Sequence, residues 1–391
     1  MATIITPSDE GLQKGVAQIY PIVNDVFKQM TGREDIQAVD TASFVAMGQS
    51  IKMMGQTELW LNTLTRRIGA TIDAFRPYRN RFSELARTQL EWGAIVQKIT
   101  AEMPEATLDK TWDVGMMDGQ SVDQWIINNP KVHQVFFDKE AAYTFFITIQ
   151  TKLLNRAFLS ESAMQALITQ IFGKVRNKIE FTNEELARLA VANCIINLPP
   201  KQEFHLVSMY NSATGSNLDS LSCRYDAAFL RFVNATINQV SRKMETMSIL
   251  YNAEGKDRFT PQEDQKFYML ADFMTFLETV PEYQATNAKY KQLSPDILVP
   301  YWQANHTDGS KINDWSNISS IQGTLFNGKQ RKVTNLIAFL FDKEVLGTFR
   351  RDEETLTTPV NARARYYNTF WHSDNFWFNM TDENAVAFYL D

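Results

Sequence analysis

The chain has 391 residues, of which 44% are hydrophobic and 21% charged, a composition that excludes disorder over most of its length. Its formal net charge of -6 argues against a dedicated nucleic-acid-binding protein with a strongly basic surface. The 26 Phe, 13 Tyr and 8 Trp greatly outnumber the 4 His, so packing surface is plentiful and groups that titrate near neutral pH are few, which favours contact-making over catalysis.

The first 75 residues carry helical patterns. Apolar residues recur at helical spacing over 16–30 and again over 44–68, with Gly32 as the expected stop between them. Gly48 and Gly55 lie inside the second stripe, and glycine inside a helix costs ~1 kcal/mol relative to alanine. We therefore predict a helical N-terminal arm over 1–75 whose second part needs a packing partner.

No basic and apolar signal segment opens the chain, and its two cysteines are too few for a disulfide framework. The longest apolar runs fall far short of the ~20 residues that span a bilayer. We expect synthesis in the cytoplasm and no membrane contact.

Residues 76–150 change pattern. Short apolar runs over 94–99, 132–137 and 143–149 are separated by residues that form turns. These runs predict an extended β excursion. Its middle is too polar to form a core by itself, so we expect it to lie on a neighbouring surface.

Two helices are expected next. Apolar residues spaced three and four apart predict a helix over 160–178. Thr182 to Glu185 has the capping-box pattern, which predicts the start of a second helix that runs to about Ile196. Pro199-Pro200 ends it, because proline lacks an amide proton and disfavours helix in the residue before it.

The rest of the chain mixes helices and strands. Apolar spacing from Phe229 to Met244 predicts a helix, and Thr260-Pro261 predicts the start of another. Strands are expected over 333–341 and 345–350, joined by a turn at Asp342-Lys343, and in an aromatic terminal block. The elements follow no regular βαβ period, which indicates an α+β fold.

Motifs that would carry chemistry are lacking in the sequence. Gly328-Lys329 lacks the other residues of a phosphate-binding loop, the four His form no HExxH pair, and neither Cys lies in a CxxC. Neighbouring acidic residues such as Glu184-Glu185 are interpreted as solvated, because adjacent residues of a helix do not face one another. We therefore expect no catalytic, cofactor-binding or metal-binding residue.

One rival interpretation stays open at this point. A soluble enzyme could assemble its site from distant residues such as His372, Asp374 and Glu383. A histidine that titrates near neutral pH in a cleft would support that interpretation.

Clustered arginines are the strongest charge feature. Arg76, Arg79, Arg81 and Arg87 alternate with aromatic residues. They could contact phosphate or form salt bridges between subunits, and the negative net charge favours the second interpretation. Arg350-Arg351 precedes three acidic residues and could pair with a neighbouring copy. The alternative for both groups is an ordinary solvated surface.

Three sequence segments occur in an order that resembles the major capsid proteins of tailed bacteriophages. They are Leu64-Thr65-Arg66-Arg67-Ile68-Gly69, the aromatic segment 365–372, and the terminal Asn-Ala-Val-Ala-Phe of 384–388. The helical region 160–196 and Leu230-Arg231-Phe232-Val233 lie between them in matching order. The closer likeness is to the short-tailed, protein-primed, phi-29-like (Picovirinae-type) group.

This resemblance implies a Hong Kong 97-type fold. Its parts would be the arm over 1–75, an extended loop over 76–150, a peripheral domain with a spine helix over 151–200 and 329–391, and an axial domain over 201–328. An added immunoglobulin-like domain, present in some members, is not expected because the chain stops at Asp391.

The resemblance also implies the function. Copies would assemble into pentameric and hexameric capsomers of an icosahedral virion shell around double-stranded DNA, with a scaffolding protein and a portal protein as partners. Contact with the packaged DNA would be weak and non-specific, because strong phosphate neutralisation gives tight binding. Another virion component, such as a portal or collar protein, is the nearest alternative.

Overall fold

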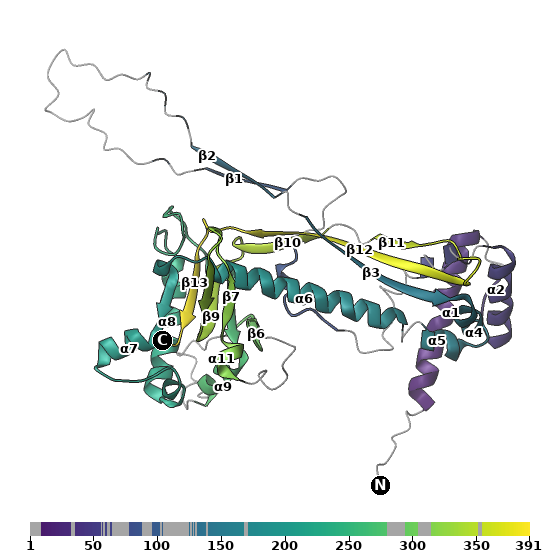
Figure 1. The fold of residues 1–391 in the computed structure, drawn as a ribbon, viewed down its shortest axis with the longest axis horizontal. Helices are drawn as coiled ribbons and strands as arrows, with labels where there is room; N and C mark the ends of the chain where they lie inside the picture. Colours follow the sequence, from purple (N-terminus) through teal and green to yellow (C-terminus); the bar gives the residue numbers. More distant parts are fainter. Residues whose placement is uncertain are drawn as a thin grey trace, which may run out of the picture. The chain divides into compact units, whose positions relative to one another are not determined.

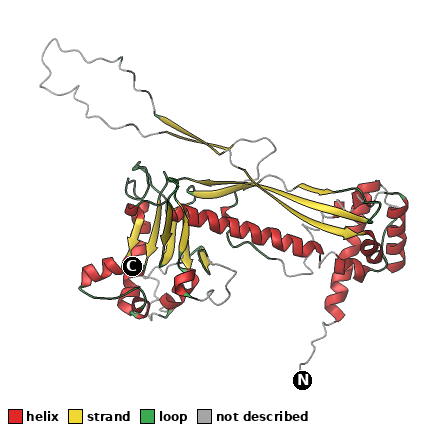
Figure 2. Cartoon of the chain, in the orientation of Figure 1, coloured by secondary structure: helices red, strands yellow, loops and turns green. Residues whose placement is uncertain are grey.

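The computed structural model describes residues 9–32, 36–55, 57, 59–60, 63–64, 78–87, 96–101, 104, 125, 127, 129, 131–137, 140–167, 171–279, 294–303, 314–350 and 354–391. The chain forms two compact units. The first comprises Met1–Trp92, Glu140–Arg188 and Phe349–Asn375, and the second comprises Gly93–Lys139, Leu189–Thr348 and Phe376–Asp391. Figure 1 traces the elements along the chain, and Figure 2 separates helices from strands.

The first unit has an apolar core shared by α1 (Asp9–Thr31), α2 (Thr41–Met53), α4 (Thr151–Ala157) and α5 (Glu161–Leu167). Ile179 of the helix that follows them also belongs to this core. Gly32 follows α1 with φ of 66° and its N–H donates to the Lys28 carbonyl, as predicted for a glycine stop. Most described members of the predicted apolar stripes are buried in this core, as expected: Val23, Val26, Phe27, Phe44, Met47, Ile51 and Leu64. Met54 differs, because it follows the end of α2 and is exposed.

Gly48 shows why the second stripe contains glycine. A Cβ atom at this position would lie 2.5 Å from Cδ1 of Phe158, well inside van der Waals contact. The Phe158 ring also packs against Trp60, with ring centroids 4.8 Å apart. Helix α2 therefore approaches the end of α4 more closely than any residue with a side chain would allow.

A four-stranded sheet contains β3 (Glu140–Gln150), β10 (Leu346–Arg350), β11 (Glu354–Thr357) and β12 (Tyr366–Asn379). Strand β12 pairs with the other three. Alternate residues from Tyr367 to Asn375 are buried and the ones between them are half-buried, the pattern of a sheet with one covered face. The predicted strands over 143–149 and 365–372 are confirmed.

Helix α6 (Gly173–Ile196) differs from the prediction. A new helix start at Thr182 is wrong, because the helix is continuous through that residue. Ile179, Asn183 and Ala187 form one buried stripe, so packing favours an uninterrupted helix over the local capping signal. The end at Ile196 is confirmed, and the Arg331 guanidinium donates to the Ile196 carbonyl at 3.0 Å.

The second unit is built on a five-stranded sheet of order β4-β13-β9-β5-β6. Its strands are β4 (Glu203–His205), β13 (Ala385–Tyr389), β9 (Leu336–Asp342), β5 (Gln265–Leu270) and β6 (Ile297–Val299). Strand β9 is antiparallel to both β13 and β5. The outer strands are parallel to their neighbours: β4 pairs with β13, and β6 pairs with β5. Every residue of β9 and β13 is buried, so both faces of the sheet centre are covered.

Around this sheet are α7 (Leu206–Thr214), α8 (Ala227–Met244), α9 (Ala271–Glu278) and α11 (Trp315–Ile318). Two hairpins complete the unit: β7 (Ile321–Thr324) with β8 (Gln330–Val333), and β1 (Val96–Ala101) with β2 (Val132–Phe137). The predicted helix ending at Met244 is confirmed as α8, which Asp226 caps through the Phe229 N–H at 2.7 Å.

The helix predicted after Thr260 is wrong. Only a single 3₁₀ turn, Gln262–Asp264, precedes β5. The Thr260 hydroxyl donates to Oδ2 of Asp342 at 2.7 Å and accepts from Asn384 at 3.2 Å, and no side chain caps the 3₁₀ turn that follows. Because β5 fills the sheet between β9 and β6, extended backbone is required where the local pattern favoured a helix.

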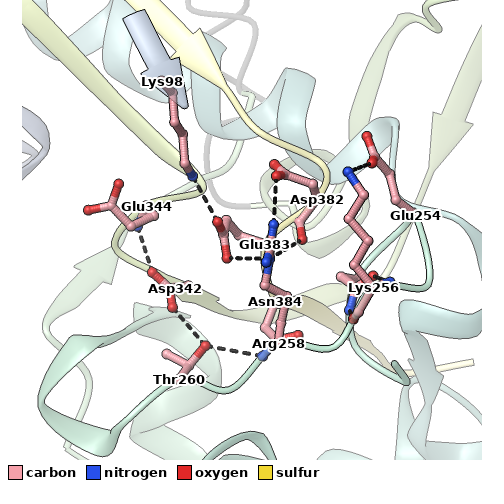
Figure 3. Close-up of polar contacts among 11 residues, drawn as sticks. Lys98, Glu254, Lys256, Arg258, Thr260, Asp342, Glu344, Asp382, Glu383 and Asn384 are labelled. Carbon is pink, nitrogen blue, oxygen red and sulfur yellow. Dashed lines mark hydrogen bonds and ion pairs between the residues drawn. The ribbon is translucent and has the colours of Figure 1, made fainter. Parts of the chain in front are cut away.

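A cluster of three buried polar side chains, those of Thr260, Asp342 and Asn384, links this part of the sheet (Figure 3). Asn384 donates to the Thr260 hydroxyl at 3.2 Å, and the Glu344 N–H donates to Asp342 at 2.7 Å, which confirms the predicted turn at 342–343. Desolvation by burial raises the pKa of Asp342, and its hydrogen bonds from Glu344 and Thr260 oppose that shift.

We predict that Gly48→Ala lowers the free energy of unfolding of the unassembled chain by roughly 1–3 kcal/mol, because the added methyl overlaps the Phe158 ring. In a Phe158→Ala background the ring is gone, so Gly48→Ala should be neutral or stabilising by up to ~1 kcal/mol. Denaturant unfolding of the four proteins in a double-mutant cycle measures both effects. Additive effects would contradict the close approach.

A second prediction concerns pH. Because its folded-state pKa is raised, Asp342 contributes stability that is full below the ordinary pKa of 3.8 and is lost as pH rises through the folded value. Between pH 4 and 7, wild type should therefore lose stability relative to Asp342→Asn, as urea unfolding would measure. Asp219 is the control, since hydrogen bonds from Ser222 lower its pKa below 3.8. Its contribution to stability is complete above that value and is lost only at lower pH, so the difference between wild type and Asp219→Asn should stay nearly constant between pH 4 and 7. A constant difference between wild type and Asp342→Asn would contradict the prediction.

Candidate inter-subunit surfaces

The β1–β2 hairpin presents an apolar face to solvent. Its antiparallel register places Ile99, Val132 and Phe136 on the same side, which we call the hairpin face. These side chains are 63%, 55% and 55% exposed. A two-stranded hairpin is at best marginally stable alone, so a hairpin with this much exposed apolar surface favours a covering partner.

The opposite side of the hairpin is anchored (Figure 3). Lys98 Nζ lies 2.8 Å from Oε1 of Glu383, and Arg258 Nε lies 3.3 Å from the other Glu383 oxygen. Arg258 also reaches Oδ2 of Asp382 at 3.2 Å. Charge-assisted hydrogen bonds of this kind are stronger than neutral ones. The hairpin root is therefore tied to the loop just before β13, while the hairpin face stays open.

The structure describes four of the six predicted interface arginines. Arg79, Arg81 and Arg87 share the segment 78–87, where the first two are exposed and the third is half-buried. Arg350 is half-buried at the end of β10. The remaining two, Arg76 and Arg351, lie outside the described residues.

A buried carboxylate holds the segment 78–87 in place. Glu184 of α6 accepts hydrogen bonds from the Tyr78 hydroxyl at 2.7 Å, the Arg81 N–H at 3.3 Å and the Arg188 guanidinium at 2.7 Å. Desolvation and the bond to Glu184 raise the pKa of Tyr78 to about 12. The expectation of a solvated Glu184 is wrong, because this side chain is 3% exposed. The sequence signal that could have predicted a paired Glu184 is Arg188, which lies four residues later on the same face of the helix.

The same segment separates apolar from charged residues. Phe82 and Leu85 are 2% and 4% exposed, and the Arg188 guanidinium lies 5.9 Å from the Phe82 ring centroid. Arg79 and Arg81, in contrast, carry exposed side chains. The buried side chains of the segment hold its backbone in place, and the two arginine side chains remain exposed to solvent.

Two residues of the rival enzyme site, His372 and Glu383, form contacts within the fold. His372 Nδ1 lies 3.1 Å from the Thr144 hydroxyl, and its ring stacks on Phe370 with centroids 6.4 Å apart. Glu383 is engaged by Lys98 and Arg258. Within the described ranges, no group of three or more His, Cys, Asp or Glu side chains could hold a metal ion. No helix in the same ranges combines the length and apolarity needed to cross a membrane.

Comparison with known proteins gives consistent matches. Residues 21–389 match the family model described as "Phi29-like phage major capsid protein". The major capsid protein of Bacillus phage B103 is 23% identical, and that of Bacillus phage PZA is 22% identical. Each match covers 98% of this chain and 76% of the relative.

Two solved structures share the fold. "Capsid structure of Staphylococcus phage Andhra" matches with a TM-score of 0.53 and 12% identity, over 81% of this chain and 86% of that chain. The structure of head fiber and inner core protein gp22 of native bacteriophage P68 matches with a TM-score of 0.52 and 11% identity, over 82% and 87%. The predicted α+β capsid fold of Hong Kong 97 type is confirmed.

The family match extends over nearly the whole chain and confirms the resemblance found in the sequence. The curated relatives are major capsid proteins, which are structural proteins and neither enzymes nor portal or collar proteins. The chain therefore belongs to the phi29-like phage major capsid proteins, which form the capsid of the virion.

Proposed function

We propose that copies of this chain form pentameric and hexameric capsomers, which close into an icosahedral shell around double-stranded DNA. The observation that carries the proposal is the hairpin face, open on one side and anchored on the other by Lys98 and Glu383. Closed symmetric assemblies require a subunit that presents surfaces to several neighbours at once.

The hairpin face supplies the apolar part of such a contact. Full burial of one large apolar side chain contributes about 1.5–3 kcal/mol. Because Ile99, Val132 and Phe136 are each only about half exposed, covering all three with a second copy stabilises the contact by less than three times that amount. Each copy repeats the contact around a ring. The hairpin is thus proposed to lie across the neighbouring subunit.

Charged contacts would complement the apolar one. Arg79 and Arg81 are exposed on a segment whose backbone is held by Glu184. The backbone that carries these two side chains therefore loses little further conformational freedom on association. We propose that these arginines, together with Arg76, Arg87, Arg350 and Arg351, pair with acidic groups of adjacent copies.

The domain roles and remaining partners are proposals of the same kind. The arm is assigned to 1–75, the extended loop to 76–150, the peripheral domain to 151–200 and 329–391, and the axial domain to 201–328. Synthesis is placed in the host bacterial cytoplasm. A scaffolding protein and a portal protein are proposed partners, and DNA contact is proposed to be weak because the chain carries a net charge of -6.

The hairpin face is tested by Phe136→Ser, with Gln134→Ser as a matched control on the same face. Since Phe136 is 55% exposed, the change should alter unfolding free energy by no more than ~0.5 kcal/mol. Sedimentation and negative-stain microscopy, of protein made alone and with the neighbouring viral genes, should show shells or rings for wild type and the control and only small species for Phe136→Ser. Normal shells from Phe136→Ser would refute the proposed contact.

The arginine segment is tested by comparing Arg79→Glu with Glu184→Ala. Reversing the exposed charge should reduce assembly and leave monomer unfolding nearly unchanged. Removing Glu184 leaves the Arg188 charge buried without its partner, so unfolding free energy should fall by roughly 3–5 kcal/mol. If Arg79→Glu assembles as well as wild type, Arg79 belongs to a solvated surface.

A further inference from the structure

Three carboxylates and two cations meet where the β1–β2 hairpin joins the second unit (Figure 3). The carboxylates belong to Asp342, Asp382 and Glu383, and the cations are Lys98 and Arg258. Both cations contact Glu383, and Arg258 also contacts Asp382. These contacts leave Asp342 as the one carboxylate of the three that forms no ion pair in the described part of the chain.

Asp342 is also the group of this cluster that water stabilises least. Its side chain is 6% exposed, and both of its hydrogen-bond donors are neutral groups. Burial raises its pKa, and the charges of Glu383 and Glu344 add to that effect. Lys343 follows Asp342 in the chain, but its ammonium group pairs with Asp264. The charged neighbours of Asp342 therefore include two carboxylates that oppose its ionisation.

Hydrogen bonds hold Asp342 close to the residue that anchors the hairpin. The Asp342 N–H donates to the Asn384 carbonyl at 2.8 Å, and the Thr260 hydroxyl connects Oδ2 of Asp342 to the Asn384 side chain. Asn384 directly follows Glu383. In addition, Oδ1 of Asp382 is buried and has no hydrogen-bond partner among the described residues. The cluster thus has fewer cations and donors than its carboxylates can use.

We infer that the hairpin anchor is a proton-linked latch, in which the bond from Lys98 to Glu383 and the ionised form of Asp342 favour one another. While Lys98 is bound, it offsets part of the Glu383 charge that acts on Asp342. When Lys98 leaves, that charge acts in full and favours the protonated form of Asp342. Because such coupling is reciprocal, protonation of Asp342 weakens the hold on Lys98 by the same factor.

The direction of the effect follows from the charges. Neutral pH keeps Asp342 ionised and the hairpin root bound, whereas acidification loosens the root. Arg258 contacts both Glu383 and Asp382, so it holds the acceptor in place while the hairpin is free. Regulation of the hairpin contact with a neighbouring copy by this latch rests on the proposed function. The latch itself is a property of the single chain.

Protonation of Glu383 is the competing explanation for an anchor that responds to pH, because it would break the bond to Lys98 directly. The structure favours Asp342, since Glu383 contacts two cations and Asp342 contacts none in the described ranges. The variant Asp342→Asn separates the two explanations, because it removes the proposed linked group and keeps Glu383.

The first test measures the titration of Asp342 in the unassembled full chain by carbon NMR of the aspartate carboxyl groups, with Asp342→Asn to assign the signal. Lys98→Met should raise the titration midpoint by about half a pH unit or more. Lys256→Met is the matched control, because Lys256 has the same 21% side-chain exposure as Lys98 but pairs with Glu254. It should leave the midpoint in place. An unchanged midpoint in Lys98→Met would overturn the inference.

The second test keeps Lys98 and follows the hairpin itself by hydrogen exchange of residues 96–101 and 132–137. Wild type and Asp342→Asn are compared at the same pH, so that the intrinsic pH dependence of exchange cancels. Asparagine stands in for protonated Asp342, so the variant should exchange about threefold faster or more at pH 7. The difference should disappear as pH falls through the Asp342 midpoint. Equal exchange at every pH would refute the latch, and faster exchange of both proteins on acidification would assign the effect to Glu383.

The outcomes separate the latch from the proposed function. If Lys98→Met shifts the Asp342 midpoint but wild type forms no shells or rings, the latch stands and the proposed function fails. If wild type assembles but neither the midpoint nor the hairpin exchange responds to these substitutions, the latch alone is overturned.

Discussion

The pairing of β13 between β4 and β9 is the constraint on which the second unit depends. The strand joins residues close to the end of the chain to backbone from 203–205 and 336–342, and all five of its side chains are buried. Without it, β9 would lose one neighbour and the sheet would divide. The same strand also fixes Glu383, which lies just before it and holds the hairpin through Lys98. Closure of the core and placement of the hairpin root thus depend on one strand.

Buried charge has a comparable part in the first unit. Glu184 would be costly to bury alone, but three donors satisfy it and thereby draw the segment 78–87 onto α6. Phe82 of that segment is buried, whereas Arg79 and Arg81 on either side of Asn80 are exposed. Core formation and surface presentation are therefore two results of the same set of contacts.

Elements with a strong repeating pattern could be predicted from the sequence: the β2 and β12 strands, α8, and the end of α6. The errors at Thr182 and Thr260 have a common cause, since each local helix-start signal was overridden by partners distant in sequence. Arg79 and Arg81 could be chosen as candidates because charge clusters are visible in the sequence, and their part in an interface stays a prediction. The bond from Lys98 to Glu383 spans 285 positions, and the open face of the hairpin depends on strand register, so neither could be predicted from spacing.

The way the hairpin is anchored has a mechanical consequence. Glu383 is held beside a strand locked in a sheet, whereas Lys98 reaches it through a flexible four-carbon side chain with three equivalent donors. Such a joint fixes where the hairpin begins but constrains its direction weakly, so it acts as a swivel. The five-fold and six-fold rings proposed above would differ in curvature, and a hairpin joined in this way would reach the neighbouring copy in both without refolding the body that carries it.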